Sequence, residues 1–419
     1  MIVAPIRNDK PIIKSLMDND FYKFTMGQLV LHRYPDIMVL FRLINRTKKV
    51  RLADHIDIGQ LREELDHARS LRFGNSEIHY LRGTNEYSER MFKEDYLDFL
   101  TALQLPEYNL EVGSDGQLHL DFVGRWPVVM YWEILALAIV NELYFRSLTK
   151  NLTQLEKESI FATGILRLQE KINRLIEFPM ITYCDFGTRR RFGREWQYYV
   201  ISRLAQAFPR GQFLGTSNTW MAVLLNLLPM GTAAHELFMV LAAIAGNDEA
   251  VRLSHNKVLQ DWWDEYGWGL SIALTDTFGS DFFFQDMTAE QAKNWKGLRQ
   301  DSGDPFKFGE KAIAFYKRHG INPKDKLIVF SDGLDLPTIL HLATFFEGRI
   351  KTTFGWGTNL TNDLGFPTLS LIVKAMKANG RPTVKLSDNL AKALGELDEV
   401  MRYKKIFRYT DAEYVECKS

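Results

Sequence analysis

The chain has 419 residues, 46% of them hydrophobic and 25% charged, which is the composition of an ordinary globular protein with room for two or three domains. Its 52 Lys and Arg residues balance 52 Asp and Glu residues, so it lacks the positive excess that a nucleic-acid-wrapping surface or a basic membrane anchor needs. Only Cys184 and Cys417 are cysteines, so a disulfide framework is excluded and a reducing, cytoplasmic compartment is expected.

Neither a signal peptide nor a membrane span is predicted. The first twenty residues contain no apolar segment of secretory length. The longest uncharged stretch, 211–234, is interrupted by Asn218, Asn226 and Pro229, and it therefore predicts core and loops.

The first 140 residues mix helical and strand patterns. Phe21, Phe24 and Leu29 fall on one face of an expected helix over 18–35. Further helices are expected over 58–68, 89–103 and 132–145, and strands over 39–44, 118–122 and 128–129.

From residue 181 onward, short apolar strands alternate with helices. The expected strands are 181–186, 213–216, 270–275, 297–300, 326–330 and 350–354, and the expected helices are 195–207, 218–228, 305–317 and 336–346. This alternation predicts parallel strand–helix–strand units.

All six strands end in glycine with small polar or acidic residues. The ends read Asp185-Phe-Gly-Thr-Arg189, Gly215-Thr-Ser-Asn218, Thr275-Asp-Thr-Phe-Gly279, Asp301-Ser-Gly-Asp304, Ser331-Asp-Gly-Leu-Asp335 and Gly355-Trp-Gly-Thr-Asn359. In an α/β barrel the carboxyl ends of the strands meet on one face and carry the site. Turn chemistry alone is the alternative at any one strand, but six repeats favour a site.

Several of these residues suit phosphorylated ligands, and each has a structural alternative. Asp301 and Asp304 suit ribose hydroxyls or Mg²⁺, although Asp304 before Pro305 is also a good helix cap. The glycines of the last two strand exits allow backbone N–H groups to approach a phosphate.

The residues alone leave two roles undecided, those of an arginine run and of one histidine. Arg189, Arg190 and Arg191 form either an anion-binding loop or a solvated basic loop. His235, among small residues, is either a general base, metal ligand or phosphoryl acceptor, or a satisfied buried histidine. Cys184, inside a strand, is expected to be a buried apolar residue.

Taken in order, these motifs resemble the nicotinate phosphoribosyltransferase family over nearly the whole chain. The remaining motifs that carry the resemblance are Asp20-Phe-Tyr-Lys-Phe-Thr-Met26 and Gly231-Thr-Ala-Ala-His-Glu236. The resemblance implies an irregular α/β barrel of the type II phosphoribosyltransferase kind over 146–365. It also implies an α+β N-terminal domain over 1–145, against which residues of about 366–419 pack.

The resemblance implies ATP-coupled transfer of phosphoribose from 5-phosphoribosyl 1-pyrophosphate (PRPP) to nicotinate, giving nicotinate mononucleotide and pyrophosphate. This reaction is the first step of NAD salvage from nicotinate. Mg²⁺ would be held through substrate phosphates, and the direct protein ligands stay open. The active unit would be a homodimer with shared active sites.

The resemblance also implies a role for individual residues of this chain. His235 resembles the phosphohistidine, Asp276 the carboxylate that orients it, and Asp301 the ribose-hydroxyl acceptor beside Asp304. Phe186 and Tyr22 resemble the two rings that sandwich the pyridine, with Tyr22 donated by the partner subunit. The remaining ligand contacts are Arg189 and Arg299, and Gly333, Gly355 and Gly357 with Thr358 as the 5′-phosphate cradle. Whether Arg190 or Arg191 shares the role of Arg189 stays open.

Ser217 favours the acid as the substrate. Relatives that use nicotinamide carry Asp at this position, where a carboxylate would repel nicotinate and a hydroxyl can donate to it. The alternatives are a nicotinamide or quinolinate phosphoribosyltransferase, or a catalytically silent phosphate-binding barrel. Quinolinate would need more cations in the pocket, and the intact acids and His235 argue against a silent barrel.

Overall fold

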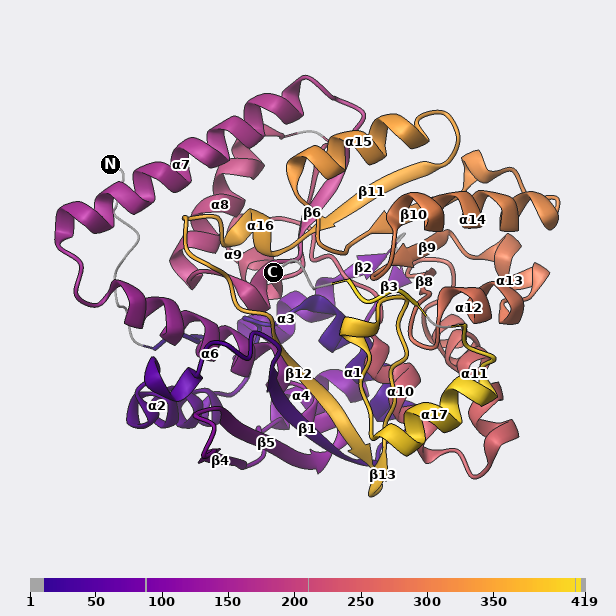
Figure 1. Ribbon diagram of the computed structural model, residues 1–419, viewed down its shortest axis with the longest axis horizontal. Coiled ribbons are helices and arrows are strands. Elements are labelled where there is room, and N and C mark those ends of the chain that lie inside the picture. Colours follow the sequence, from indigo (N-terminus) through magenta and orange to yellow (C-terminus); the bar gives the residue numbers. More distant parts are fainter. Residues whose placement is uncertain (1–10, 87–88, 210, 411, 416–419) are drawn as a thin grey trace.

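The computed structural model describes residues 11–86, 89–209, 211–410 and 412–415. Cys417 lies outside these residues, and Cys184 is buried as expected. The chain forms an antiparallel sheet with helices at one end and a parallel sheet with helices at the other (Figure 1). The expected pairing of an α/β barrel with an α+β domain is therefore confirmed.

The antiparallel sheet joins the two ends of the chain. Its strand order is β13-β12-β1-β5-β4, with β1 at Met38–Asn45, β4 at Tyr108–Val112, β5 at Leu118–Arg125, β12 at Leu371–Ala378 and β13 at Arg381–Pro382. β1 pairs with β12 from Val39 opposite Ala378 to Asn45 opposite Leu371. A late segment of the chain thus completes the sheet of the first domain (Figure 1).

The helices of the first part are α1 (Phe21–Arg33), α2 (Ile58–Ser70), α3 (Asn75–Gly83), α4 (Glu94–Ala102), α5 (Trp126–Val129), α6 (Trp132–Thr149) and α7 (Gln154–Ile176). Two expectations are wrong here. Residues 128–129 belong to α5, where Pro127 suits a first helical turn. Residues 89–90 form β3 of a small hairpin with β2 (Asn85–Glu86), so the helix begins only at Glu94.

One helical segment, Trp126–Thr149, is long and apolar enough to cross a membrane by length and composition alone. Its most apolar window is 94% buried within the protein, and it carries the buried polar residues Glu133, Asn141 and Glu142. A core helix passes the same length test, and this segment packs as one.

The parallel sheet contains all six strands expected from the sequence. Its order is β7-β6-β11-β10-β9-β8, with β6 at Tyr183–Asp185, β7 at Phe213–Thr216, β8 at Ile272–Leu274, β9 at Gly297–Gln300, β10 at Leu327–Phe330 and β11 at Lys351–Trp356. No pairing joins β7 to β8 among the described residues, so the barrel is irregular.

The helices of this part are α8 (Arg194–Ala207), α9 (Thr219–Leu225), α10 (His235–Ile244), α11 (Asp248–Tyr266), α12 (Ser280–Asp286), α13 (Ala289–Asn294), α14 (Pro305–Arg318), α15 (Leu336–Phe346) and α16 (Thr358–Thr361). α9 ends early because Asn226 adopts a left-handed conformation, with a φ of 51°. α10 follows the loop after α9, and its first residue, His235, contacts Thr277 and Asp301 beyond the ends of β8 and β9.

The chain returns to the barrel after β13. Residues 383–394 run past the carboxyl end of β8, where Leu386 N donates to Thr277 O (2.8 Å). This segment contains a short 3₁₀ turn at Leu390–Lys392, and α17 (Leu397–Ile406), the last helix among the described residues, packs beside α11 (Figure 1). This return segment brings new side chains to the strand ends.

Candidate active site

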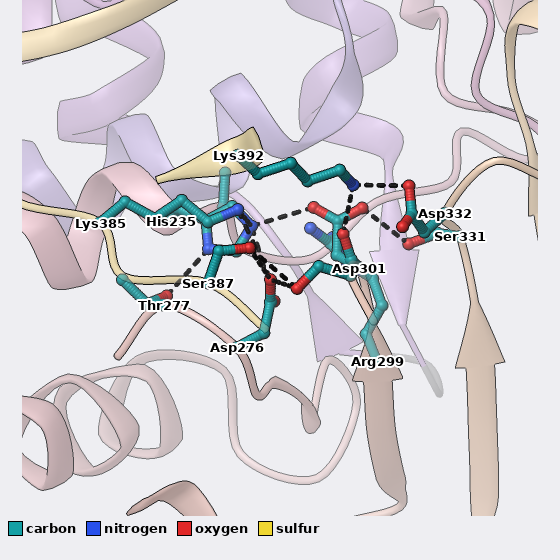
Figure 2. A network of polar contacts seen from close by, with 12 residues as sticks. His235, Asp276, Thr277, Arg299, Asp301, Ser331, Asp332, Lys385, Ser387 and Lys392 are labelled. Atoms are coloured by element: carbon teal, nitrogen blue, oxygen red, sulfur yellow. Dashed lines mark hydrogen bonds and ion pairs between the residues drawn. The ribbon is translucent and has the colours of Figure 1, made fainter. Parts of the chain in front are cut away.

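The imidazole of His235 lies at the centre of a polar network on the carboxyl face of the barrel (Figure 2). Its Nδ1 lies 2.9 Å from Thr277 Oγ1, and its Nε2 lies 2.9 Å from Asp301 Oδ2. The residue is 4% exposed and stands at the first position of α10. Both ring nitrogens therefore have a polar partner within the protein.

Asp276 lies beside His235 without bonding to it directly. Its Oδ1 is 3.7 Å from Nε2, beyond hydrogen-bond distance, while its Oδ2 accepts from Ser302 Oγ (2.5 Å). Thr277 and Asp301 make the hydrogen bonds that orient the ring. Asp276 instead supplies a buried negative charge next to it.

Two lysines complete the network, and both come from the return segment after β13. Lys385 Nζ lies 3.0 Å from His235 Nε2 and 3.5 Å from Asp276 Oδ2. Lys392 Nζ donates to the Asp301 backbone carbonyl (2.6 Å) and to Asp332 Oδ1 (2.5 Å). Anionic groups of a ligand would meet both ammonium groups here (Figure 2).

Sequence reasoning missed these lysines, together with Thr277, Ser302 and Ser387. Ser387 Oγ donates to Ser302 Oγ (2.9 Å) and also contacts Asp276. The available signal was the run Lys385-Leu-Ser-Asp-Asn389 with Lys392, which is rich in polar residues although the residues around it are buried. No spacing rule connects that run to a strand end more than a hundred residues earlier.

The charges in the network set the protonation of His235. Burial and then the Lys385 ammonium lower the pKa of His235 to about 4, against the pull of Asp276 and Asp301. Burial opposes charge on Asp301, but Lys392 and the His235 hydrogen bond hold its pKa well below its usual range. At neutral pH the imidazole is therefore neutral and the carboxylates are ionised.

His235, Asp276 and Asp301 each offer an atom within 4.8 Å of the others, a spacing that could hold a metal ion. Mg²⁺ prefers oxygen ligands, however, and the Lys385 ammonium already lies against both His235 and Asp276. These three residues therefore do not fit a resident Mg²⁺ site, and a metal carried by substrate phosphates suits the pocket better.

Tyr22 and Arg189 lie close enough for each to affect the pKa of the other. The Tyr22 hydroxyl is buried without a hydrogen-bond partner among the described residues. Burial and the neighbouring Glu133 raise the Tyr22 pKa well above its usual value, while Arg189 acts in the opposite direction. Arg189 forms no hydrogen bond or ion pair with the described part of the chain, so its guanidinium is available to an anionic ligand.

The structure brings Tyr22 to the barrel of its own chain. Phe21 N donates to Ser217 O (2.7 Å), which docks the start of α1 on the end of β7. A Cβ added to Gly231 would lie 2.8 Å from Tyr22 N, so the two backbones touch. Tyr22 therefore lies on the barrel of its own chain, and whether it also serves a partner subunit stays a prediction.

The hydroxyl of Ser217 already donates a hydrogen bond within the protein. Ser217 Oγ donates to Asp20 Oδ1 (2.7 Å), and both residues are buried. A hydroxyl has one proton, so in this arrangement Ser217 cannot also donate to a nicotinate carboxylate. In this arrangement the Ser217 hydroxyl therefore gives no support to the acid, whereas a guanidinium such as that of Arg189 can pair with a carboxylate.

The other arginines have different roles. Arg191 is fully buried and forms a bidentate pair with Asp18, at 2.7 and 2.9 Å, so it holds the loop and not a ligand. Arg299 donates to the Ala233 carbonyl (3.0 Å), two residues before His235. Asn362 Nδ2 bonds the Arg190 carbonyl (2.7 Å), which ties the same loop to the segment after β11.

Asp304 lies outside the His235 network. It is exposed and caps α14, accepting from Phe306 N (2.8 Å) and Lys307 N (3.1 Å). It lines a cavity of about 680 Å³ that Gly333 and Lys392 also line. The capping role is thus what the geometry shows for Asp304.

The glycines after β11 make room for Phe186. A Cβ on Gly355 would lie 2.3 Å from the Phe186 ring, and Phe186 N donates to Trp356 O (2.9 Å). Gly357 packs near the Phe186 backbone and precedes Thr358, the first residue of α16. Gly333 has a φ of 56°, a conformation that favours glycine at the end of β10.

A parallel barrel with a neutral histidine, carboxylates and lysines at its strand ends, beside an unpaired arginine and an aromatic ring, is an α/β-barrel enzyme site for a phosphorylated, anionic substrate. Comparisons with known proteins define the family. The profile of the Nicotinate phosphoribosyltransferase (NAPRTase) family matches residues 181–411, and that of the NAPRTase N-terminal domain matches residues 17–141.

Solved structures match nearly the whole chain. The nicotinate phosphoribosyltransferase of Vibrio cholerae is 33% identical, with a TM-score of 0.84, and the match covers 96% of this chain and 95% of that one. That of Porphyromonas gingivalis is 29% identical, with a TM-score of 0.82, covering 95% and 100%. The chain belongs to the nicotinate phosphoribosyltransferase family.

Proposed function

We propose that this chain couples phosphoribosyl transfer to ATP hydrolysis through a phosphorylated His235. The transfer itself is the activity of the family: phosphoribose passes from PRPP to the ring nitrogen of nicotinate, giving nicotinate mononucleotide and pyrophosphate for NAD salvage. The observation that carries the proposal is a neutral, buried imidazole with an ammonium group 3.0 Å from its Nε2.

Nε2 is the nitrogen that would attack the γ-phosphorus of ATP. At rest Nε2–H donates to the ionised Asp301 carboxylate. Attack therefore requires Asp301 to turn to the ribose hydroxyls of PRPP and the ring proton to move to Nδ1, where Thr277 accepts it; Nε2 then carries the lone pair and faces Lys385. As the N–P bond forms, the bond from phosphorus to the ADP oxygen breaks and ADP leaves. Water later cleaves the N–P bond and releases phosphate. Lys385 stabilises the charge on the transferred group.

The substrates would divide the pocket between them. Arg189 binds the nicotinate carboxylate, and Tyr22 and Phe186 contact the ring. Asp301 accepts from the ribose hydroxyls of PRPP, and Lys385 and Lys392 contact its pyrophosphate. Mg²⁺ would arrive on the PRPP phosphates. Glycines at the exits of β10 and β11, Gly333, Gly355 and Gly357, would accommodate the 5′-phosphate.

The oligomeric state and the cellular compartment of the protein stay predictions. A cytoplasmic location fits the cysteine usage of the sequence. A homodimer with shared active sites is likewise a prediction, and the contact of α1 with the barrel of its own chain offers an alternative placement for Tyr22.

The test of the ATP coupling is a phosphoprotein assay. Incubation with ATP labelled at the γ-position should give an acid-labile, base-stable label on the wild type. His235→Ala should lose both the label and ATP hydrolysis but keep some ATP-independent transfer. The control is His255→Ala, which removes another buried histidine with an acidic partner, Asp286 at 2.7 Å. A label that survives in His235→Ala would refute the assignment.

A further inference from the structure

Three buried charged side chains, Lys23, Glu133 and Glu236, lie together with the partly buried Lys374. Lys23 Nζ lies 2.6 Å from Glu133 Oε2 and 2.5 Å from Glu236 Oε2. Lys374 Nζ lies 3.0 Å from the other oxygen of Glu133. Lys23, Glu133 and Glu236 are each at most 1% exposed, and none of them belongs to the network around His235.

The Lys23–Glu236 pair connects two residues that are adjacent in the chain to site residues. Lys23 follows Tyr22 in the first turn of α1, and Glu236 follows His235 in the first turn of α10. Glu236 is held at its other oxygen by Trp126 Nε1, at 2.6 Å. Movement of either first turn would therefore strain a short, buried ion pair.

Other contacts join α1 to the segment that carries His235. Thr25 Oγ1 donates to Thr232 O (2.8 Å), and Ala234 N lies 3.1 Å from Met26 Sδ. The backbone of Tyr22 touches Gly231. Residues 22–26 and 231–236 are thus connected by four contacts, of which the Lys23–Glu236 pair is the charged one.

We infer that Lys23 and Glu236 are positioning residues that couple occupancy of the nicotinate pocket at Tyr22 to the orientation of His235. This inference rests on the proposed function, because it assigns the coupling of ATP use to nicotinate binding. A ligand that settles against Tyr22 fixes the first turn of α1. The ion pair then fixes the first turn of α10, and with it the imidazole.

The cluster allows both charges to be removed without leaving an unpaired one. Lys23→Met together with Glu236→Gln removes one positive and one negative charge, and Glu133 keeps Lys374 as its partner. Glutamine at 236 can still accept from Trp126. The double variant is therefore expected to fold, which a thermal unfolding curve checks.

The experiment compares the wild type, the double variant and a control in the presence of ATP, PRPP and nicotinate. The control is Lys326→Met, which removes a buried lysine that donates to the Lys293 and Trp295 carbonyls near the opposite ends of the strands. The readouts are the KM for nicotinate, the ADP formed per nicotinate mononucleotide, and phosphohistidine formed without nicotinate.

Coupling between two sites commonly changes an affinity by roughly 5–150-fold. The double variant should raise the nicotinate KM by about fivefold or more and increase ADP formed per product, while phosphohistidine still forms without nicotinate. The Lys326→Met control should form as much ADP per nicotinate mononucleotide as the wild type. A double variant with wild-type KM and ratio would overturn the positioning role alone. A wild type that forms no phosphohistidine would overturn the proposed ATP coupling, and this inference with it.

Discussion

Replacing Lys385 with methionine should make His235 titrate near neutral pH. The ammonium lies 3.0 Å from Nε2, and after burial it is the largest cause of the low His235 pKa, about 4. A unit charge about 4 Å away contributes about 4 kcal/mol at an effective dielectric constant of about 20. That energy corresponds to roughly a thousandfold in the protonation constant.

The expected result is a His235 pKa between about 6 and 7 in Lys385→Met, because burial still opposes protonation while Asp276 and Asp301 now favour it. NMR titration of histidine labelled at the imidazole measures this value, and the spectrum of His235→Gln identifies the resonance. Phosphohistidine formation at pH 6 should fall in the variant relative to pH 8 more than it does in the wild type.

The same change affects stability. The wild-type His235 pKa lies below its usual 6.5, so between pH 6.5 and about 4 the unfolded chain binds a proton that the folded chain does not. Stability from this group is therefore lost as pH falls through that window, by about 3 kcal/mol in total. In Lys385→Met the free energy of unfolding should fall less steeply between pH 6.5 and about 4. A variant whose His235 pKa stays near 4 would show that burial alone keeps the ring neutral, and would refute the electrostatic role of Lys385.

Three further outcomes are expected. Asp301→Asn should raise the KM for PRPP by roughly ten- to a hundredfold, the loss of a charge-assisted hydrogen bond of about 1.5–3 kcal/mol; an unchanged KM with a lower melting temperature would favour a structural role. Gly355→Ala should displace the Phe186 ring, which an added Cβ would approach to 2.3 Å, and weaken nicotinate binding in an isothermal titration; unchanged binding would separate Phe186 from the pyridine site. Mixing Tyr22→Ala with Asp301→Ala chains should restore no activity, because each chain carries its own Tyr22; recovery after verified subunit exchange would establish a shared site.

The sequence by itself determined the elements whose information is local. Six parallel strands and the acidic, glycine-rich ends after them were predictable, because strand periodicity and turn chemistry depend on neighbouring residues. The order of those motifs also indicated the family. The resemblance to that family, and not local pattern alone, placed His235 and Asp301 together in the site, and the structure puts them 2.9 Å apart.

Only the tertiary structure decided how distant segments share the site. Lys385 and Lys392 come from a return segment that no local pattern connects to His235, and Tyr22 reaches the barrel of its own chain through the Phe21–Ser217 contact. Hydrogen-bond competition was equally invisible in the sequence: Ser217 donates to Asp20, and Arg191 is held by Asp18 while Arg189 is not. Side-chain type states which bonds a residue can make, but three-dimensional packing decides which partner takes them.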